Sequence, residues 1–225
     1  MQHDAQSSSE QRADRALWMV GCLRVGALTI PHPISERDIA ADADFATRLF
    51  ASAGVKRGDV VLITSGSSEY GQFWPYEVSL ESMGACLAIA ENLPFDASRS
   101  EMFLRRLPVA AAFGIGMPVL DGMHGMGISL EKAFTATPIV FARDAAADRL
   151  RAAGIAAWRL LNLGPAFAFQ KPDGEVIYDR DEWLLEADDG WLTISSLKLR
   201  ANPLVRFRSP VRGTVTSQQR TVSVA

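Results

Sequence analysis

Short apolar runs alternate with amphipathic helical patterns through the first two-thirds of this 225-residue chain. Residues 60–63 are entirely apolar, which is typical of a strand buried on both faces of a parallel sheet. Similar runs follow at residues 86–90, 109–113, 137–142 and 155–163. Helical patterns separate them, at residues 77–85, 98–107 and 144–153. This alternation predicts a parallel sheet with crossover helices.

Residues that start and stop helices support this interpretation. Ser35 precedes a helical pattern and is followed three residues later by Asp38, which predicts a capping box. Gly54 stands where a glycine commonly ends a helix. Ser98 and Glu101 have the spacing of a second capping box.

The pattern changes after Gly164. Strand-like runs follow at residues 166–170, 175–178, 182–187, 191–196 and 203–208, with turn residues between several of them. We therefore expect an α/β fold, with a parallel sheet and crossover helices followed by an antiparallel β subdomain. The expected division is a disordered tail at 1–16, an α/β core at 17–164, a β-rich subdomain at 165–216 and a tail at 217–225.

Charge and composition exclude several classes of protein. The net charge of −3 provides no field for nucleic acid, although residues 197–225 hold six basic and no acidic residues. These arginines are either solvated strand-edge residues or contacts for an anion. The longest apolar run, residues 107–120, is interrupted by proline and glycine, and the N-terminus does not resemble a signal peptide. We expect a cytoplasmic protein with no membrane partner. Cys22 and Cys86 lie in apolar runs and are expected to be buried free thiols.

Several segments together carry a family resemblance. Residues 36–66, ERDIAADADFATRLFASAGVKRGDVVLITSG, resemble the start of the core of adenylate-forming (AMP-dependent) ligases, and most of all phenylacetate–coenzyme A ligases. Residues 81–84 (ESMG) are similar to that family's Glu-x-Leu-Gly helix end. Residues 192–197 and 202–208 resemble its "TSL … PVIRYR" strand pair. The resemblance covers roughly residues 20–215, in the same order, and implies the large-domain core of these ligases.

Departures from the family pattern concern ATP. The resemblance places the phosphate-gripping loop at residues 24–34, which hold two prolines and no lysine, and proline donates no N–H. Residues 161–165 lack the family's carboxylate that helps to place Mg²⁺, and Val211 stands where the family has a ribose-binding aspartate. The family also continues into a small domain with a catalytic lysine, beyond the point where this chain ends. The resemblance thus implies a shortened, degenerate relative. No cofactor is expected, ATP and Mg²⁺ included, whereas a coenzyme A thioester stays open as a ligand.

Candidate site residues gather after the first buried strand, because ligands of open α/β sheets bind at the carboxyl ends of the strands. The ligand-binding candidates are Ser67, Ser68, Tyr70, Phe73, Trp74, Tyr76, Glu77 and Asn162. The alternative is a capped helix N-terminus with aromatic side chains packed beneath it. The candidate anion contacts are Arg24, Arg206 and Arg208. No metal site is expected, since no metal-ligand spacing occurs.

Three functions remain open from the sequence. The first is a protein that binds a small aromatic or other acyl carboxylate, its thioester, or a partner protein, without adenylation. The second is an enzyme that uses acid–base chemistry on an acyl group activated elsewhere, with Glu69, Tyr70, Glu77 and His124 as candidate groups. His124 lies in a glycine-rich stretch, residues 122–127, which we expect to be a loop. The third is a ligase completed by a partner chain, and a homodimer is also expected.

Overall fold

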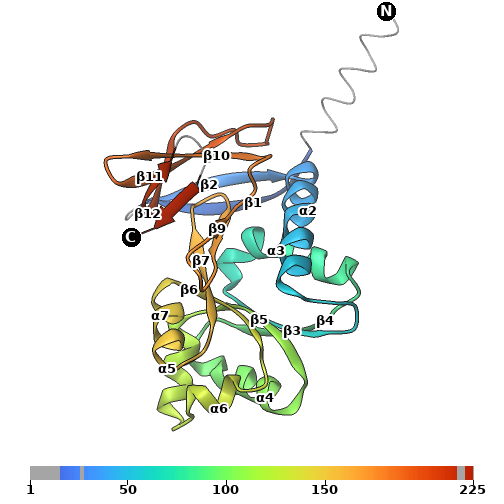
Figure 1. Cartoon of the computed structure of the whole chain (residues 1–225). Helices are drawn as coiled ribbons and strands as arrows, with labels where there is room; N and C mark the ends of the chain where they lie inside the picture. The colour runs from blue at the N-terminus through green and yellow to red at the C-terminus, as the bar shows by residue number, and fades with distance from the viewer. Residues whose placement is uncertain (1–15, 26–27, 217–220, 225) are drawn as a thin grey trace, which may run out of the picture.

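The computed structural model describes residues 16–25, 28–216 and 221–224. The described strands form three sheets, of seven, four and two strands. Figure 1 shows helices α4, α5 and α6 at one end of the molecule and the two smaller sheets at the other. The mixed α/β class predicted from the sequence is confirmed.

The large sheet has the strand order β4-β3-β5-β6-β7-β8-β9. Its strands are β3 (Val60–Ser65), β4 (Cys86–Glu91), β5 (Val109–Ile115), β6 (Ile139–Arg143), β7 (Ala157–Asn162), β8 (Phe167–Gln170) and β9 (Val176–Ile177). The pairs from β4 to β7 are parallel, and those from β7 to β9 are antiparallel. The five predicted parallel strands are all present. The predicted domain division at residue 164 stays a prediction. The strands β8 and β9, which follow that residue, extend the same sheet.

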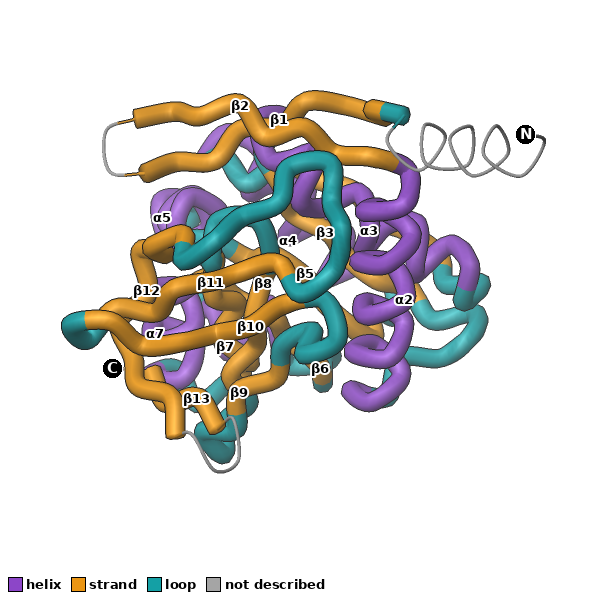
Figure 2. Tube along the Cα trace, turned by 90° about the horizontal axis from the view of Figure 1, so that it is seen from above, coloured by secondary structure: helices purple, strands orange, loops and turns teal. Residues whose placement is uncertain are grey.

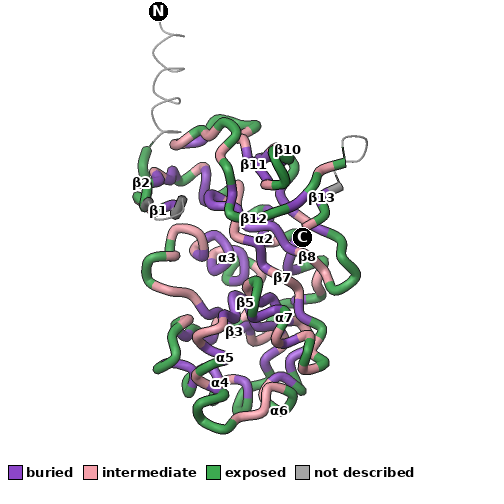
Figure 3. The backbone as a smooth tube through the Cα atoms, turned by 90° about the vertical axis from the view of Figure 1, so that its left-hand side faces the viewer, coloured by how far each residue is buried: buried purple, intermediate pink, exposed green. Residues whose placement is uncertain are grey.

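Helices cover both faces of this sheet. The helices are α2 (Glu36–Ala53), α3 (Tyr70–Ser82), α4 (Ala97–Arg106), α5 (Met117–Gly125), α6 (Leu130–Phe134) and α7 (Asp144–Ala152). Apolar residues of α2 and α3 pack with Val61 and Ile63, whereas those of α4, α5 and α7 pack with Leu62 on the other face. Figure 3 shows β3 and β5 buried between these layers. Successive strand residues point to opposite faces, so a wholly apolar run is what this arrangement requires.

Helix α2 begins and ends as its sequence predicts. The Ser35 side chain accepts a hydrogen bond from the Asp38 backbone N–H at 3.2 Å, and the Asp38 carboxylate accepts one from the Ser35 N–H at 2.9 Å. Gly54 ends the helix with φ of 101°, a left-handed conformation that is free of strain only for glycine. The capping box thus places Asp38 at the junction between β2 (Leu28–Ser35) and α2.

Two helix predictions are wrong in their bounds, and one predicted loop is largely helical. Helix α3 begins at Tyr70 rather than residue 77, because Phe73, Tyr76 and Leu80 share one buried face at helical spacing. The glycine-rich stretch 122–127 is largely the end of α5 rather than a loop, and its Met123 is fully buried. Helix α4 begins at Ala97, after the 3₁₀ turn η2 (Pro94–Asp96), so Ser98 is not its cap.

The remaining strands lie outside the large sheet. The hairpin of β1 (Leu17–Val25) and β2 (Leu28–Ser35) was not predicted, and it runs along one side of the molecule in Figure 2. The four-stranded antiparallel sheet contains β10 (Trp183–Asp188), β11 (Trp191–Ser196), β12 (Phe207–Thr216) and β13 (Thr221–Val224). Its last predicted strand, at residues 203–208, is misplaced, because pairing with β11 begins only at Phe207.

Both cysteines are exposed free thiols, which corrects the prediction of buried ones. Cys86 opens β4, the end strand of the large sheet, and Cys22 lies on the two-stranded hairpin. Within the described ranges, no helix is long and apolar enough to cross a membrane.

Candidate functional site

Arg143 lies across the carboxyl ends of three neighbouring strands. It is the last residue of β6, and its Nε donates to the Gly114 carbonyl of β5 at 2.9 Å. One of its terminal nitrogens lies 3.4 Å from the Thr64 carbonyl of β3. Gly114 has φ of 86°, and a Cβ there would lie 2.4 Å from the Thr64 carbonyl oxygen. The guanidinium therefore fills the edge where α/β sheets commonly bind ligands.

Glu69 holds this guanidinium in place. Its two carboxylate oxygens accept hydrogen bonds from the two terminal nitrogens of Arg143, one of them at 2.9 Å. Its Oε2 also accepts from the Gly66 N–H at 2.8 Å, which ties the 3₁₀ turn η1 (Ser67–Glu69) to the end of β3. Both side chains are about three-quarters buried, with exposed fractions of 24% for Glu69 and 21% for Arg143. A bidentate pair of this kind fixes both partners.

A cavity of about 330 Å³, which we call the edge cavity, opens beside this pair. It is lined by Cys22, Thr29, Ser68, Glu69, Gln72, Asn162, Gly164 and Pro210. Gln72 donates from its amide to the Gly164 carbonyl and lies 3.5 Å from the Asn162 Oδ1, which itself accepts from the Gly164 N–H at 2.9 Å. Among the side chains that the structure describes in this lining, Glu69 is the one that carries a charge, and Arg143 already neutralises it.

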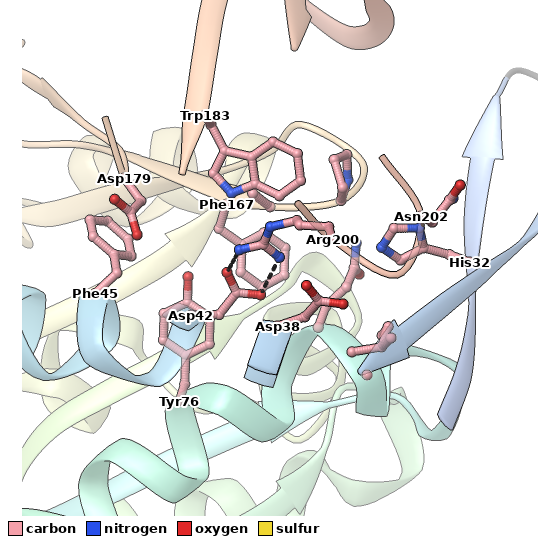
Figure 4. A pocket seen from close by; sticks show the side chains of 15 residues that line it. His32, Asp38, Asp42, Phe45, Tyr76, Phe167, Asp179, Trp183, Arg200 and Asn202 are labelled. Atoms are coloured by element: carbon pink, nitrogen blue, oxygen red, sulfur yellow. Dashed lines mark hydrogen bonds and ion pairs between the residues drawn. The ribbon is translucent and has the colours of Figure 1, made fainter. Parts of the chain in front are cut away.

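A second and smaller cavity, which we call the buried cavity, lies between α2, α3 and the segment before β12 (Figure 4). Its volume is about 30 Å³. Arg200 reaches into it, donates two hydrogen bonds to Asp42 and lies 3.3 Å from Glu182. The Arg200 guanidinium also lies 4.3 Å from the ring centre of Trp183. These contacts fasten the loop of residues 197–206 to α2.

Burial shifts the pKa values of two groups around the buried cavity. It raises the pKa of Asp42 to about 6, although the neighbouring Arg200 opposes this shift. It also lowers the pKa of His32 to about 4, and Arg200 adds to that effect. The Nδ1 of His32 lies 2.9 Å from the side-chain nitrogen of Asn202, so the imidazole is neutral and already partnered. Neither group is arranged to hold a phosphate.

The predicted aromatic site residues separate into two groups. Phe73 and Tyr76 are buried against Phe113, and Tyr76 also lines the buried cavity. Tyr70 and Trp74 lie on the outer side of α3 and stack with Trp18 of β1. The helical period thus divides residues that a loop would have brought together.

The other predicted residues also lie in different places. Ser68, Glu69 and Asn162 line the edge cavity, whereas Ser67 does not, and both serines are exposed. Glu77 is buried on α3, and burial raises its pKa. His124 is exposed at the end of α5 and is absent from the lining of either cavity.

Two of the three predicted anion contacts are exposed and engaged elsewhere. Arg206 lies 3.2 Å from Glu186 and 3.3 Å from Asp188, whereas Arg208 lies over the Trp191 ring. These contacts favour the strand-edge interpretation. The side chain of Arg24 lies outside the described part of the chain. No cluster of His, Cys, Asp or Glu in the described part could hold a metal ion.

Sequence reasoning missed Arg143, Gln72, Asp42, Arg200 and Trp183. Arg143 carried a usable signal, because it is a cation directly after an apolar strand and therefore lies at the carboxyl edge. Gln72 could have been placed only once α3 was known to begin at Tyr70. Asp42 and Arg200 are 158 residues apart, and nothing in the sequence pairs them.

The mixed sheet with helices on both faces, the β hairpin and the antiparallel sheet form an arrangement that several solved structures of acyl-CoA ligases share. A 2-hydroxyisobutyryl-CoA ligase in complex with its acyl adenylate superimposes with a TM-score of 0.71 at 15% identity, over 94% of this chain and 51% of that one. An open form of the same ligase, with acyl adenylate and CoA, gives a TM-score of 0.70 at 16% identity, over 92% of this chain and 56% of that one.

The o-succinylbenzoate CoA synthetase of Bacillus subtilis gives a TM-score of 0.63 at 10% identity, over 94% of this chain and 49% of that one. This chain therefore spans about half the length of the ligases that share its fold. No family model and no curated protein matches the sequence. The likeness is one of fold, and it does not single out phenylacetate–coenzyme A ligases.

Proposed function

We propose that this protein binds an acyl thioester in the edge cavity and does not adenylate a carboxylic acid. The observation that carries the proposal is the lining of that cavity, in which hydroxyl, amide and thiol groups surround one carboxylate that is already paired. A cavity of about 330 Å³ is within the size range of small-molecule sites. It lies at the carboxyl edge of the sheet, as ligands of α/β proteins do.

The charge of the lining favours a thioester over a free acid. A carboxylate leaving water needs a cation or several N–H donors, and Arg143, the cation described beside the cavity, is held by Glu69. A thioester carbonyl is uncharged and needs only one donor, which the hydroxyl of Ser68 can supply. The phenylacetyl group is the first acyl group to test, because the sequence resembles that of phenylacetate–coenzyme A ligases.

The same lining disfavours ATP. A triphosphate with Mg²⁺ needs cations or free N–H groups for its oxygens and a free carboxylate for the metal. Glu69 is not a free carboxylate for the metal, because both of its oxygens accept hydrogen bonds from Arg143. The strand β2, where the resemblance places the family's phosphate-gripping loop, turns His32 towards Asn202.

Acid–base catalysis by the four predicted groups has less support. Of Glu69, Tyr70, Glu77 and His124, only Glu69 lines the edge cavity. A general base must reach the proton that it abstracts, and Glu69 is bound to Arg143. We therefore place binding ahead of catalysis. The homodimer and the partner ligase chain stay predictions.

Calorimetric titration with phenylacetyl-coenzyme A, phenylacetate and ATP with Mg²⁺ tests the proposal. We expect the thioester to bind in the micromolar range, the free acid more weakly and ATP not at all. Ser68→Trp places an indole in the edge cavity and should abolish binding, whereas Ser67→Trp, at a neighbour that does not line the cavity, should not. Micromolar ATP binding, or a Ser68→Trp variant that binds as the wild type does, would overturn the proposal.

A further inference from the structure

The two cavities share one wall. Gln72 lines both of them, and Gly164 of the edge cavity is followed directly by Pro165 of the buried cavity. The amide of Gln72 is held by hydrogen bonds to Asn162, the last residue of β7, and to Gly164, two residues beyond it. The side chain of Gln72 therefore separates the edge cavity from the buried cavity.

The buried cavity presents polar atoms that have no hydrogen-bond partner in the structure. These atoms are the Asp38 Oδ1, the Trp183 Nε1 and the Arg200 Nε. All three side chains line the cavity and belong to residues that are at most 6% exposed. Two of the atoms are N–H donors and one is a carboxylate acceptor. They come from α2, β10 and the loop before β12, so only the tertiary structure brings them together.

This set of atoms selects one kind of chemical group. A second anion would meet Asp38 and Asp42, and a cation would meet Arg200, so a charged group is disfavoured in either sign. A hydroxyl group can donate a hydrogen bond to the Asp38 carboxylate and accept hydrogen bonds from the two N–H donors. The cavity volume of about 30 Å³ is that of one or two water molecules, which suits a hydroxyl group but not a ring.

We propose that the acyl group of the bound thioester ends in a hydroxyl group, which passes Gln72 and occupies the buried cavity between Asp38, Trp183 and Arg200. This inference rests on the proposed function, because the thioester itself occupies the edge cavity. A site that hydrogen-bonds a substrate hydroxyl discriminates strongly against the analogue that lacks it, since its own polar groups then stay unpaired. An acyl group with an apolar end therefore binds less tightly.

Two matched pairs of thioesters test this inference. The pairs are 4-hydroxyphenylacetyl- with phenylacetyl-coenzyme A, and 6-hydroxyhexanoyl- with hexanoyl-coenzyme A, each titrated into the wild-type protein. We expect the hydroxylated member of at least one pair to bind about tenfold more tightly or better. Ratios near one in both pairs overturn the inference and leave the proposed function standing. No binding by any of the four thioesters overturns both.

A variant separates hydrogen bonding from shape. Trp183→Phe removes the indole donor, so the preference for the hydroxylated thioester should fall severalfold while binding of the parent thioester changes little. Trp158→Phe is the matched control, because Trp158 lies outside both cavities. An undiminished preference in a folded Trp183→Phe variant contradicts the assigned donor. If this variant does not fold, the wild-type ratios still decide the question.

Discussion

Breaking the ion pair between Glu69 and Arg143 is the most direct test of how the carboxyl edge of the sheet is built. Glu69→Ala removes a carboxylate that accepts from Arg143 and from the Gly66 N–H. It leaves a guanidinium that keeps one good hydrogen bond, to Gly114 at 2.9 Å. The variant therefore strands a partly buried cation beside the edge cavity.

The size of the effect follows from burial. Exposed ion pairs contribute about 0–1 kcal/mol, whereas breaking a buried pair costs about 3–5 kcal/mol. With exposed fractions of 24% and 21%, this pair lies between the two limits, and we expect a loss of about 2 kcal/mol. For a protein of this size that corresponds to a fall in Tm of roughly 4–8 °C.

Thermal unfolding followed by circular dichroism measures this loss. Glu175→Ala is the control, because its carboxylate is 58% exposed and pairs only with Lys171, and it should change Tm by about 1 °C or less. Acetate should raise the Tm of Glu69→Ala more than that of the wild type, because it can occupy the freed guanidinium. A double-mutant cycle with Arg143→Ala should give a coupling of about 1–2 kcal/mol. A cycle with no coupling would refute the reasoning.

Three further predictions concern the surroundings of the site. Ser35→Ala removes the buried cap of α2 and should cost about 1 kcal/mol in chemical denaturation, and an unchanged midpoint would contradict the capping role. Gly164→Ala should cost more than Gly174→Ala, although both have positive φ, because its Cβ would lie 2.6 Å from Phe207 whereas nothing lies within 4 Å at Gly174; equal losses would be inconsistent with that contact. Burial raises the pKa of Asp42 from 3.8 to about 6, so the stability that Asp42 contributes is present below pH 3.8 and is lost as pH rises through 6. Burial lowers the pKa of His32 from 6.5 to about 4, so the stability that His32 contributes is present above pH 6.5 and is lost as pH falls through 4. The two oppose each other between pH 4 and 6, so Asp42→Asn should make stability rise more steeply with pH over that window than in the wild type, and a parallel profile would exclude this assignment.

The order of elements was largely predictable because it depends on local pattern. The apolar runs at residues 60–63 and 109–113 are strands of the sheet, and Ser35, Asp38 and Gly54 delimit α2 as predicted. Each of these signals is contained within a few residues and needs no distant partner. The hairpin of β1 and β2 escaped prediction because it belongs to a separate two-stranded sheet that packs on α3 and the turn η1.

The candidate site was predictable only in part. The sequence alone determined the carboxyl edge of the sheet as the place to look, and Ser68, Glu69 and Asn162 do line a cavity there. It could not determine that Glu69 is paired, because its partner Arg143 is 74 residues away on another strand. Nor could it place Tyr70 and Trp74 outside, since that depends on where α3 begins.

What the sequence determined by itself is therefore the fold class, since burial of apolar residues and helix capping act over short distances. What only the tertiary structure decided is the chemistry of the edge. Arg143 is neutralised by Glu69, and Asp38, Trp183 and Arg200 converge on one small cavity. Ion pairing and hydrogen bonding depend on angstrom distances between residues far apart in the chain, and those distances exist only once the layers have packed.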